Sequence, residues 1–291
     1  VVLSSFACAA TYYVATNGSD ATGDGSATNP WASINYADAN SLLAPGDTVF
    51  VGAGTYNQCV KLTAKSAGVL YQADAAGVTI QSTGAWSAWE VGGSVGGGYY
   101  GMGSNFGNSG PTIDGFTIVG GNAGWYGALS LYNAYRTEVR NCVIDGAGVA
   151  VPYMCAFTSY TGAGNFIHNN VVKYGGAGVG VYLADSRNDG NQIINNTIFG
   201  NPSGWAVWVT GYQAGYQPGL GQYAGLYDRV FNNILDGGYY VLDTPVGFTV
   251  EADYNLVRGG VGYHGGASQG AHDVVGLDPM LGPDYHLLPG S

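Results

Sequence analysis

One eight-residue phrase occurs six times in this chain and limits the possible folds more than any other feature. It reads IDGFTIVG from Ile113, VRNCVIDG from Val139, IHNNVVKY from Ile167, IINNTIFG from Ile193, VFNNILDG from Val230 and ADYNLVRG from Ala252. The copies start 26, 28, 26, 37 and 22 residues apart. A period of this size is typical of a solenoid, in which each repeat buries its apolar face only against its neighbours.

The first and sixth positions of the phrase are aliphatic in every copy. The first position holds Ile113, Val139, Ile167, Ile193, Val230 and Ala252, and the sixth holds Ile118, Ile144, Val172, Ile198, Leu235 and Val257. Such mostly β-branched residues favour strands over helices. A third strand is expected before the next phrase, at 129–132, 149–151, 179–183, 206–209 and 239–242. Three strands in each repeat of this length predict a parallel β-helix, with both aliphatic positions facing its interior.

Asparagine fills the turn between the first two strands of the repeat. The turn residues are Asn141, Asn169, Asn170, Asn195, Asn196, Asn232, Asn233 and Asn255. Asparagine tolerates left-handed backbone angles and can hydrogen-bond in tight bends. We therefore expect stacked amides that hydrogen-bond along the solenoid axis and have a structural role.

The two ends of the chain differ from the repeats. Trp31, Ile34, Ala37 and Leu42 are spaced as on one face of a helix, after a possible N-cap at Asn29. A helix over 31–43 would cover one end of the solenoid, within a single domain over 11–291. Residues 1–10, VVLSSFACAA, are apolar. They resemble the remnant of an export signal, and the alternative is a strand that packs Val1, Val2, Leu3 and Phe6 against another copy.

The composition excludes some partners and favours others. The net charge is −11 and the sequence pI about 4.4, with only 8 Lys and Arg among 291 residues. No basic stripe can then follow a phosphate backbone, so nucleic acid is not an expected partner. No apolar run is long enough to span a membrane. Charged residues make up 9% of the chain, which favours a neutral partner, a glycan or a second copy.

The chain has four cysteines: Cys8, Cys59, Cys142 and Cys155. Their spacing is not that of a zinc site, and no metal site is expected from it. An even number fits an exported protein. The most economical disulfides are Cys8–Cys59 and Cys142–Cys155, and the alternative is buried free thiols.

Both ends of the sequence resemble a known group of proteins. The opening TYYVATNGSDATGDGSATNPWASI, followed by APGDTVFVGAGTY, and the ending LDPM with DYHLLPGS are similar to secreted right-handed parallel β-helix proteins of the pectin-lyase-like superfamily. The resemblance covers nearly the whole chain. It implies an all-β, single-stranded, right-handed parallel β-helix in an extracellular or cell-surface protein, often one that acts on polysaccharide. Because members include lyases, hydrolases, phage spikes and non-catalytic adhesins, the fold does not decide the function.

One loop after a predicted third strand is a candidate catalytic site. Arg187 is a possible base for β-elimination from a uronate, with Asp185 and Asp189 holding a cation such as Ca²⁺. The resemblance implies a Lys or Arg base near acidic calcium ligands, but no motif here matches those positions. Arg136 and Glu138 are predicted in a similar loop two rungs away. A solvated loop without catalytic function is the alternative, and outside a lyase no cofactor is expected.

Aromatic and charged residues supply the remaining candidates. Trp86, Trp89, Tyr212, Tyr216, Tyr223 and Tyr227 lie in two predicted loops, where they would stack on sugar rings or form an interface between proteins. The pairs Asp145–Lys173, Asp236–Arg258 and Asp114–Arg140 are expected to be ion pairs between neighbouring rungs.

These patterns favour a non-catalytic extracellular subunit that assembles head-to-tail into a fibre or surface layer. The alternative is a carbohydrate-active enzyme, either a polysaccharide lyase or a glycoside hydrolase. The scarcity of cations favours the structural role, because an acidic protein is poorly suited to anionic substrates.

Overall fold

A computed structural model covers the whole chain. The residues that it describes are 9–82, 87–92, 109–120, 127–132, 134–146, 155–160, 163–174, 178–186, 190–200, 204–211, 228–242, 250–259, 264–265, 268–283 and 288–289. Their strands form three sheets, named here A, B and C, and all strand pairs within each sheet are parallel.

Over residues 48–265, each turn of the chain gives one strand to each sheet. Sheet A contains β1 (Thr11–Val14), β2 (Thr48–Val51), β5 (Leu70–Ala73), β8 (Thr112–Asp114), β11 (Glu138–Arg140), β14 (Phe166–His168), β17 (Gln192–Ile194), β20 (Asp228–Phe231) and β23 (Val250–Asp253). Sheet B contains β3 (Gly54–Asn57), β6 (Val78–Gln81), β9 (Thr117–Val119), β12 (Val143–Asp145), β15 (Val171–Lys173), β18 (Thr197–Phe199), β21 (Ile234–Asp236), β24 (Leu256–Arg258) and β26 (Val274–Val275). Sheet C contains β4 (Val60–Leu62), β7 (Trp89–Val91), β10 (Leu129–Tyr132), β13 (Cys155–Tyr160), β16 (Val179–Ser186), β19 (Trp205–Gly211), β22 (Gly238–Leu242) and β25 (His264–Gly265).

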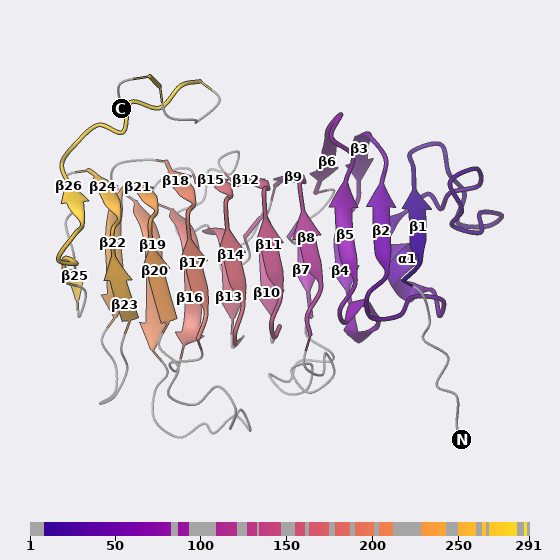
Figure 1. Cartoon of the computed structure of the whole chain (residues 1–291), viewed down its shortest axis with the longest axis horizontal. Coiled ribbons are helices and arrows are strands. Elements are labelled where there is room, and N and C mark those ends of the chain that lie inside the picture. Colours follow the sequence, from indigo (N-terminus) through magenta and orange to yellow (C-terminus); the bar gives the residue numbers. More distant parts are fainter. Residues whose placement is uncertain are drawn as a thin grey trace.

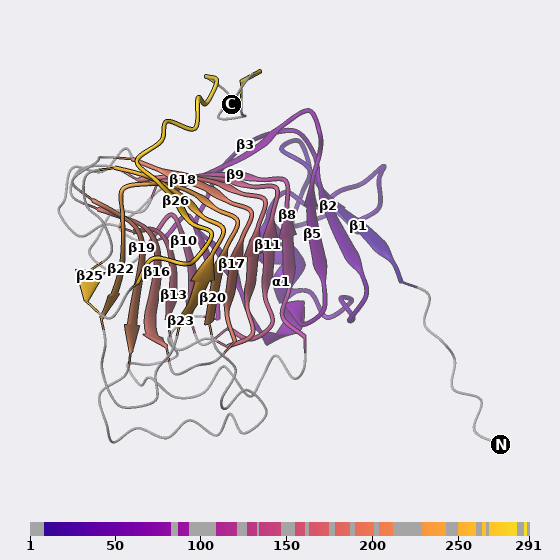
Figure 2. The same ribbon diagram turned by 60° about the vertical axis from the view of Figure 1, so that its left-hand side comes forward.

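From β2 to β25 the chain passes through the three sheets in the order A, B, C and then repeats the circuit, with β1 added to sheet A before it and β26 to sheet B after it. Figure 1 shows the coils side by side along one axis, from the indigo N-terminal coil to the yellow C-terminal coil, and Figure 2 shows the three walls around the interior. The predicted right-handed parallel β-helix is confirmed. In the coil that contains β11 and β12, the third strand was predicted at 149–151. It is β13, at Cys155–Tyr160, which pairs with β10 so that Phe157 is in register with Leu129.

The two aliphatic positions of the repeat face the interior as predicted. At the first position the five residues from Ile113 to Val230 are fully buried, and the six at the sixth position are at most 1% exposed. Ala252 is the exception, since it is only partly buried against the core. Burial of this continuous aliphatic column holds neighbouring coils together.

The two residues of each A–B turn have different conformations and partners. The first is left-handed, with φ of 54° to 60° at Asn141, Asn169, Asn195, Asn232 and Tyr254. The second is buried and joins a ladder. Asn170, Asn196 and Asn233 each donate through Nδ2 to the Oδ1 of the asparagine one coil further on, at 3.0–3.1 Å. The predicted amide stacking along the axis is confirmed.

A second ladder runs along the corner before sheet A and was not predicted. Asn165 Nδ2 donates to Asn191 Oδ1 at 3.1 Å, and the Asn191 backbone donates to Asp228 Oδ1 at 2.7 Å. The first ladder ends in the same way, because the Asn255 backbone donates to Asp273 Oδ1 at 2.7 Å. A carboxylate only accepts hydrogen bonds, so it ends a chain of amides without leaving a donor over.

A helix does pack at the N-terminal end, but it is shorter than 31–43. α1 spans Ile34–Ala39, and its N-cap is Ser33, whose side chain accepts from the Tyr36 backbone, rather than Asn29. Trp31 precedes the helix because its backbone pairs with the outer edge of β1, donating to Tyr13 O at 3.0 Å. The apolar spacing that predicted a longer helix therefore includes residues that pair as extended chain.

α1 covers the outer edge of β4 with side chains instead of a backbone ladder. Asn35 Oδ1 accepts from the Lys61 backbone at 2.7 Å, and Asn35 Nδ2 donates to Cys59 O at 2.9 Å. Asp38 Oδ1 accepts from the Thr63 backbone at 2.9 Å. At this end the open edge of sheet C is satisfied, which blocks pairing with another strand there.

The predicted disulfide between Cys142 and Cys155 is wrong, because Cys142 is a buried free thiol. It lies in the A–B turn, where its Sγ is 3.1 Å from Arg140 O and 3.7 Å from Ile113 O. Burial raises the pKa of this thiol to about 12, so it is unreactive at neutral pH. Cys59 Sγ lies 3.7 Å from Ser82 Oγ, and Cys8, with Val1, Val2, Leu3 and Phe6, lies outside the described residues.

Candidate functional site

The connections around sheet C vary, whereas the A–B turns do not. Every A–B turn in the repeats has two residues between its strands. The connections that enter and leave sheet C range from the single residue Gly237 to the long segment 212–227. Variable loops on a rigid scaffold are where proteins commonly place binding and catalytic residues. A binding site is therefore expected first on the outer face of sheet C.

One register column runs along this outer face. Its positions, from β4 to β25, are Lys61, Glu90, Ser130, Thr158, Tyr182, Trp208, Tyr240 and His264. The neighbouring positions, such as Trp89, Leu129 and Val207, belong to the main core. Because side chains alternate across a strand, the described side chains of the column, such as Glu90, Tyr182 and Trp208, face away from the core.

Four residues of β16 and β19 form an apolar cluster on this face, separate from the main core. Val179 and Tyr182 are buried in it, and Trp205 and Trp208 are partly exposed. The Trp208 ring lies 4.7 Å from that of Tyr182 and 5.4 Å from that of Trp205. Sequence analysis missed these residues, although the motif WAVWV carried a signal. Residues three apart on a regular strand would face opposite sides. The two indoles share a face because the pairing of β19 with β22 shifts register between Trp205 and Val207.

A polar group lies at the other end of the same column. Glu90 is partly buried, in register with Lys61 on one side and with buried Ser130 on the other. Burial raises the pKa of Glu90, and the nearby Lys61 charge offsets only part of this effect. Ser130 Oγ and Ser87 Oγ are 2.6 Å apart. Trp208 and Glu90 are four rungs apart, about 19 Å at about 4.8 Å per rung.

Most of the predicted site residues are not among those that the structure describes. Asp185 lies near the end of β16, and its side chain is not among those described. Arg187, Asp189, Trp86, Tyr212, Tyr216, Tyr223 and Tyr227 lie outside the described residues. The segments 187–189 and 212–227 directly follow β16 and β19, which carry the aromatic cluster.

The prediction for Trp89 is wrong. Its side chain is 0% exposed and packs edge-on against Phe116, with ring centroids 4.8 Å apart. It belongs to β7, which interrupts the Gly-rich segment that was expected to be one long loop. A core indole cannot stack on a ligand or form an interface.

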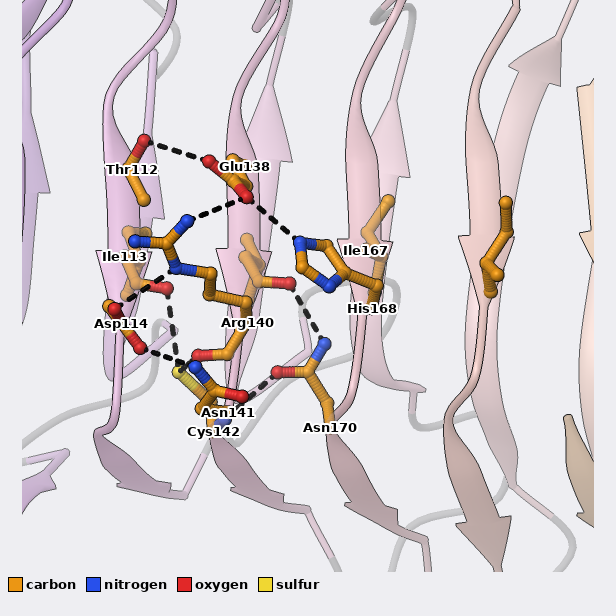
Figure 3. A network of polar contacts seen from close by, with 12 residues as sticks. Thr112, Ile113, Asp114, Glu138, Arg140, Asn141, Cys142, Ile167, His168 and Asn170 are labelled. Carbon is orange, nitrogen blue, oxygen red and sulfur yellow. Dashed lines mark hydrogen bonds and ion pairs between the residues drawn. The ribbon is translucent and has the colours of Figure 1, made fainter.

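A second polar cluster lies on the outer face of sheet A (Figure 3). Glu138 Oε1 is 3.0 Å from Arg140 Nη1 and 2.8 Å from His168 Nε2, while Oε2 accepts from Thr112 Oγ1 at 3.2 Å. Asp114 accepts from Arg140 Nε at 3.0 Å. Glu138 was expected in a loop after a third strand, but it begins β11, where it faces these partners across neighbouring rungs.

The ion pairs and hydrogen bonds of this second cluster link neighbouring coils, which indicates a structural role. Burial alone would raise the pKa of Glu138, but hydrogen bonds from His168, Arg140 and Thr112 and the Arg140 charge lower it below its ordinary value. An acid that protonates a leaving group needs a raised pKa instead. Glu138 is therefore a poor proton donor at neutral pH, and Arg140 is already shared by two carboxylates.

The other predicted ion pairs are confirmed. Lys173 Nζ lies 3.4 Å from Asp145, and Arg258 Nη1 lies 3.9 Å from Asp236. Arg229 adds a pair with Glu251 at 2.9 Å. Partly exposed pairs of this kind contribute at most about 1 kcal/mol each.

Neither a metal site nor a membrane-spanning helix is found among the described residues. Across the described ranges, no three His, Cys, Asp or Glu side chains come close enough together to hold a metal ion. In the same part of the chain, no helix has the length and apolar character needed to cross a membrane.

The molecule is thus a parallel β-helix with an aromatic and polar column on its most variable face. A family model described as the right-handed beta helix region matches residues 52–217, and the chain belongs to that family. No curated protein matches the sequence.

Several solved structures are similar to this chain. One is XylC in complex with xylose, at 12% identity and a TM-score of 0.53 over 87% of this chain and 66% of that one, so this chain spans just under two thirds of its length. A rhamnogalacturonan lyase has 15% identity and a TM-score of 0.46 over 91% and 84% of the two chains. A GH136 lacto-N-biosidase from Eubacterium ramulus has 12% identity and a TM-score of 0.29 over 92% and 68%. At 12% identity the likeness to XylC is one of fold.

Proposed function

We propose that this protein is an extracellular carbohydrate-binding β-helix protein, which binds a polysaccharide along the outer face of sheet C. The observation that supports this most is the cluster of Tyr182, Trp205 and Trp208, whose two indoles are partly exposed on the face with the most variable connections. Aromatic rings offer a flat apolar surface with a polar edge, which suits the alternating CH and OH groups of a sugar ring. XylC, whose fold is similar, forms a complex with the sugar xylose, which fits the proposal.

Affinity electrophoresis tests this proposal. The protein is run in native gels that contain neutral or acidic polysaccharides, next to a non-binding marker protein. We expect at least one polysaccharide to retard the wild type. Phe231→Ala, which changes a partly buried aromatic residue on the outer face of sheet A, should be retarded equally. Migration unchanged by every polysaccharide would contradict the proposal.

Cleavage of the bound glycan is a second candidate function, and Glu90 is the observation in its favour. Glycoside hydrolysis requires a carboxylic acid that stays protonated near neutral pH, and burial shifts the pKa of Glu90 in that direction. The lyase expectation for Arg187, Asp185 and Asp189 with Ca²⁺ remains a proposal. Both are alternatives to the expected non-catalytic role.

Product analysis separates these possibilities. New reducing ends that disappear in Glu90→Gln would support hydrolysis, and unsaturated products that need Ca²⁺ and disappear in Arg187→Ala would support a lyase. Glu90→Gln should also change how stability depends on pH. Because the folded pKa of Glu90 is raised, its contribution to stability is present below the unfolded pKa and is lost as the pH rises through the folded value, so melting temperatures should fall over that range in the wild type and not in Glu90→Gln. A bound but uncleaved glycan would favour the non-catalytic role.

A further inference from the structure

The aromatic cluster on sheet C indicates which polysaccharides fit. Its centre is apolar, since Val179 and Tyr182 are buried beneath the two partly exposed indoles. An apolar surface interacts with the CH face of a sugar ring but offers a carboxylate neither a hydrogen-bond donor nor a counter-charge. Moving an ionised group from water onto such a surface is unfavourable unless a cation compensates it.

Four of the described cations are already paired with carboxylates, and Lys65 Nζ donates to the backbone carbonyl of Ala39. Arg140, Lys173, Arg229 and Arg258 each pair with an acid on a neighbouring rung, at 2.9–3.9 Å. On the outer face of sheet C, Lys61 stands beside Glu90 in register. At these positions a uronate would have to compete with an existing carboxylate to gain a counter-charge.

The net charge of the whole molecule also disfavours an acidic polysaccharide. With a net charge of −11, the chain repels a polyanion at a distance before any local contact forms. A neutral chain meets no such barrier. Its sugars would extend along the register column, from Trp208 towards Glu90 about 19 Å away.

From these observations we infer that the polysaccharide bound at sheet C is uncharged, held by stacking on Trp205 and Trp208 and not by ion pairs. This inference rests on the proposed function and narrows its ligand class. It predicts binding that is insensitive to salt, because apolar stacking is not screened as charge pairing is.

The experiment uses the full chain and four probes: xylan and β-glucan as neutral polysaccharides, polygalacturonate and alginate as acidic ones. Dissociation constants are measured by affinity electrophoresis and titration calorimetry, at low salt and at about 1 M salt, where the Debye length is about 3 Å. We expect a neutral probe to bind with the same affinity at both salt concentrations. Trp208→Ala should weaken that binding about tenfold, the loss of one aromatic contact of about 1.4 kcal/mol.

Phe231→Ala is the matched control, and it should bind like the wild type. Circular dichroism and a melting curve show whether Trp208→Ala is folded, and Trp205→Phe gives a milder second variant. Tighter, salt-sensitive binding of an acidic probe would overturn the inference and leave the proposed function standing. Neutral binding unaffected in both tryptophan variants would also overturn it. If no probe binds, the proposed function itself fails.

Discussion

Three A–B turns hold two asparagines, which are chemically identical but structurally different. The first is exposed and has a left-handed backbone conformation, which asparagine tolerates better than most residues. The second is buried and hydrogen-bonded on both sides. Asn196, for example, accepts from the Asn170 backbone at 3.0 Å and donates to Ile167 O at 2.9 Å. The position within the turn, rather than the residue type, determines what a substitution removes.

Asn196→Ala should lower the free energy of unfolding by about 2–4 kcal/mol, because it leaves the buried donors of Asn170 and the carbonyl of Ile167 without their partner. Asn195→Gly, one residue earlier, should change it by less than about 1 kcal/mol, since glycine adopts φ of 58° readily. Urea unfolding followed by circular dichroism measures both. Equal losses in the two variants would show that the ladder has no special role.

Glu138 should make stability depend on pH in the acidic range. Its pKa is lowered in the folded state, so its contribution is present above the unfolded carboxyl pKa of about 4.3 and is lost as the pH falls through the folded value. The wild type should therefore lose stability between about pH 5 and pH 3 more steeply than Glu138→Gln. Unfolding midpoints across this range test the prediction, and parallel curves for the two proteins would contradict it.

Sequence analysis predicted one ladder and missed the other for a local reason. The first ladder lies inside a repeated phrase, where NN recurs at a fixed position. Asn165, Asn191 and Asp228 each lie two residues before the phrase and outside it, at a position that holds proline, threonine or valine in the other copies. Asp228 also differs in residue type, so only the three-dimensional register shows that it belongs to the series.

Among the elements, α1 shows how side chains can replace a missing strand. Asp38 is 2% exposed and accepts from the Thr63 backbone, the Thr63 hydroxyl and Ser66. Asp38→Ala should lower the free energy of unfolding by about 2–4 kcal/mol, because buried donors lose a charged acceptor. Thermal and urea unfolding provide the measurement.

Asp74→Ala is the control for this change, since Asp74 accepts from the Ala76 backbone in an exposed turn. It should cost no more than about 1 kcal/mol. If Asp38→Ala were as mild as this control, the helix would be packing on the end of the solenoid without capping it.

The repeated strands were predictable because burial repeats in every coil. The aromatic cluster was not, because its members reach one face through an irregularity in β19. Simple alternation would place Trp205 and Trp208 on opposite faces of the strand. The change of register between Trp205 and Val207 brings them together, and no composition or spacing rule contains that information.

At the scale of the whole molecule, self-assembly remains a prediction. If residues 1–10 add a strand to a neighbouring copy, removing residues 1–8 should abolish filaments and leave a folded monomer. This deletion keeps Ala10, whose backbone donates to Asp47 Oδ1 at 2.7 Å, and all of β1. A full-length variant with serine at Val1, Val2, Leu3 and Phe6 tests the apolar side chains alone.

Sedimentation velocity and electron microscopy measure the outcome. The edges of β1 and β4 are already satisfied by the chain's own residues, so a donated strand would have to add elsewhere. Filaments from the truncated protein, or monomers from the full-length one, would refute assembly through this segment.

The two amide ladders also make the solenoid electrically polar along its length. In every side-chain link of the two ladders, an amide N–H donates towards the C-terminal coils and the accepting Oδ1 faces the N-terminal ones, so these hydrogen-bond dipoles add rather than cancel. The second N–H of each amide donates to a backbone carbonyl of the preceding coil. Partial positive charge accumulates where a row ends, and there the carboxylates of Asp273 and Asp228 stand. Acidic residues neutralise the first turn of an α-helix by the same electrostatics. Here that neutralisation is performed for a row of side chains, in a fold made almost entirely of strands.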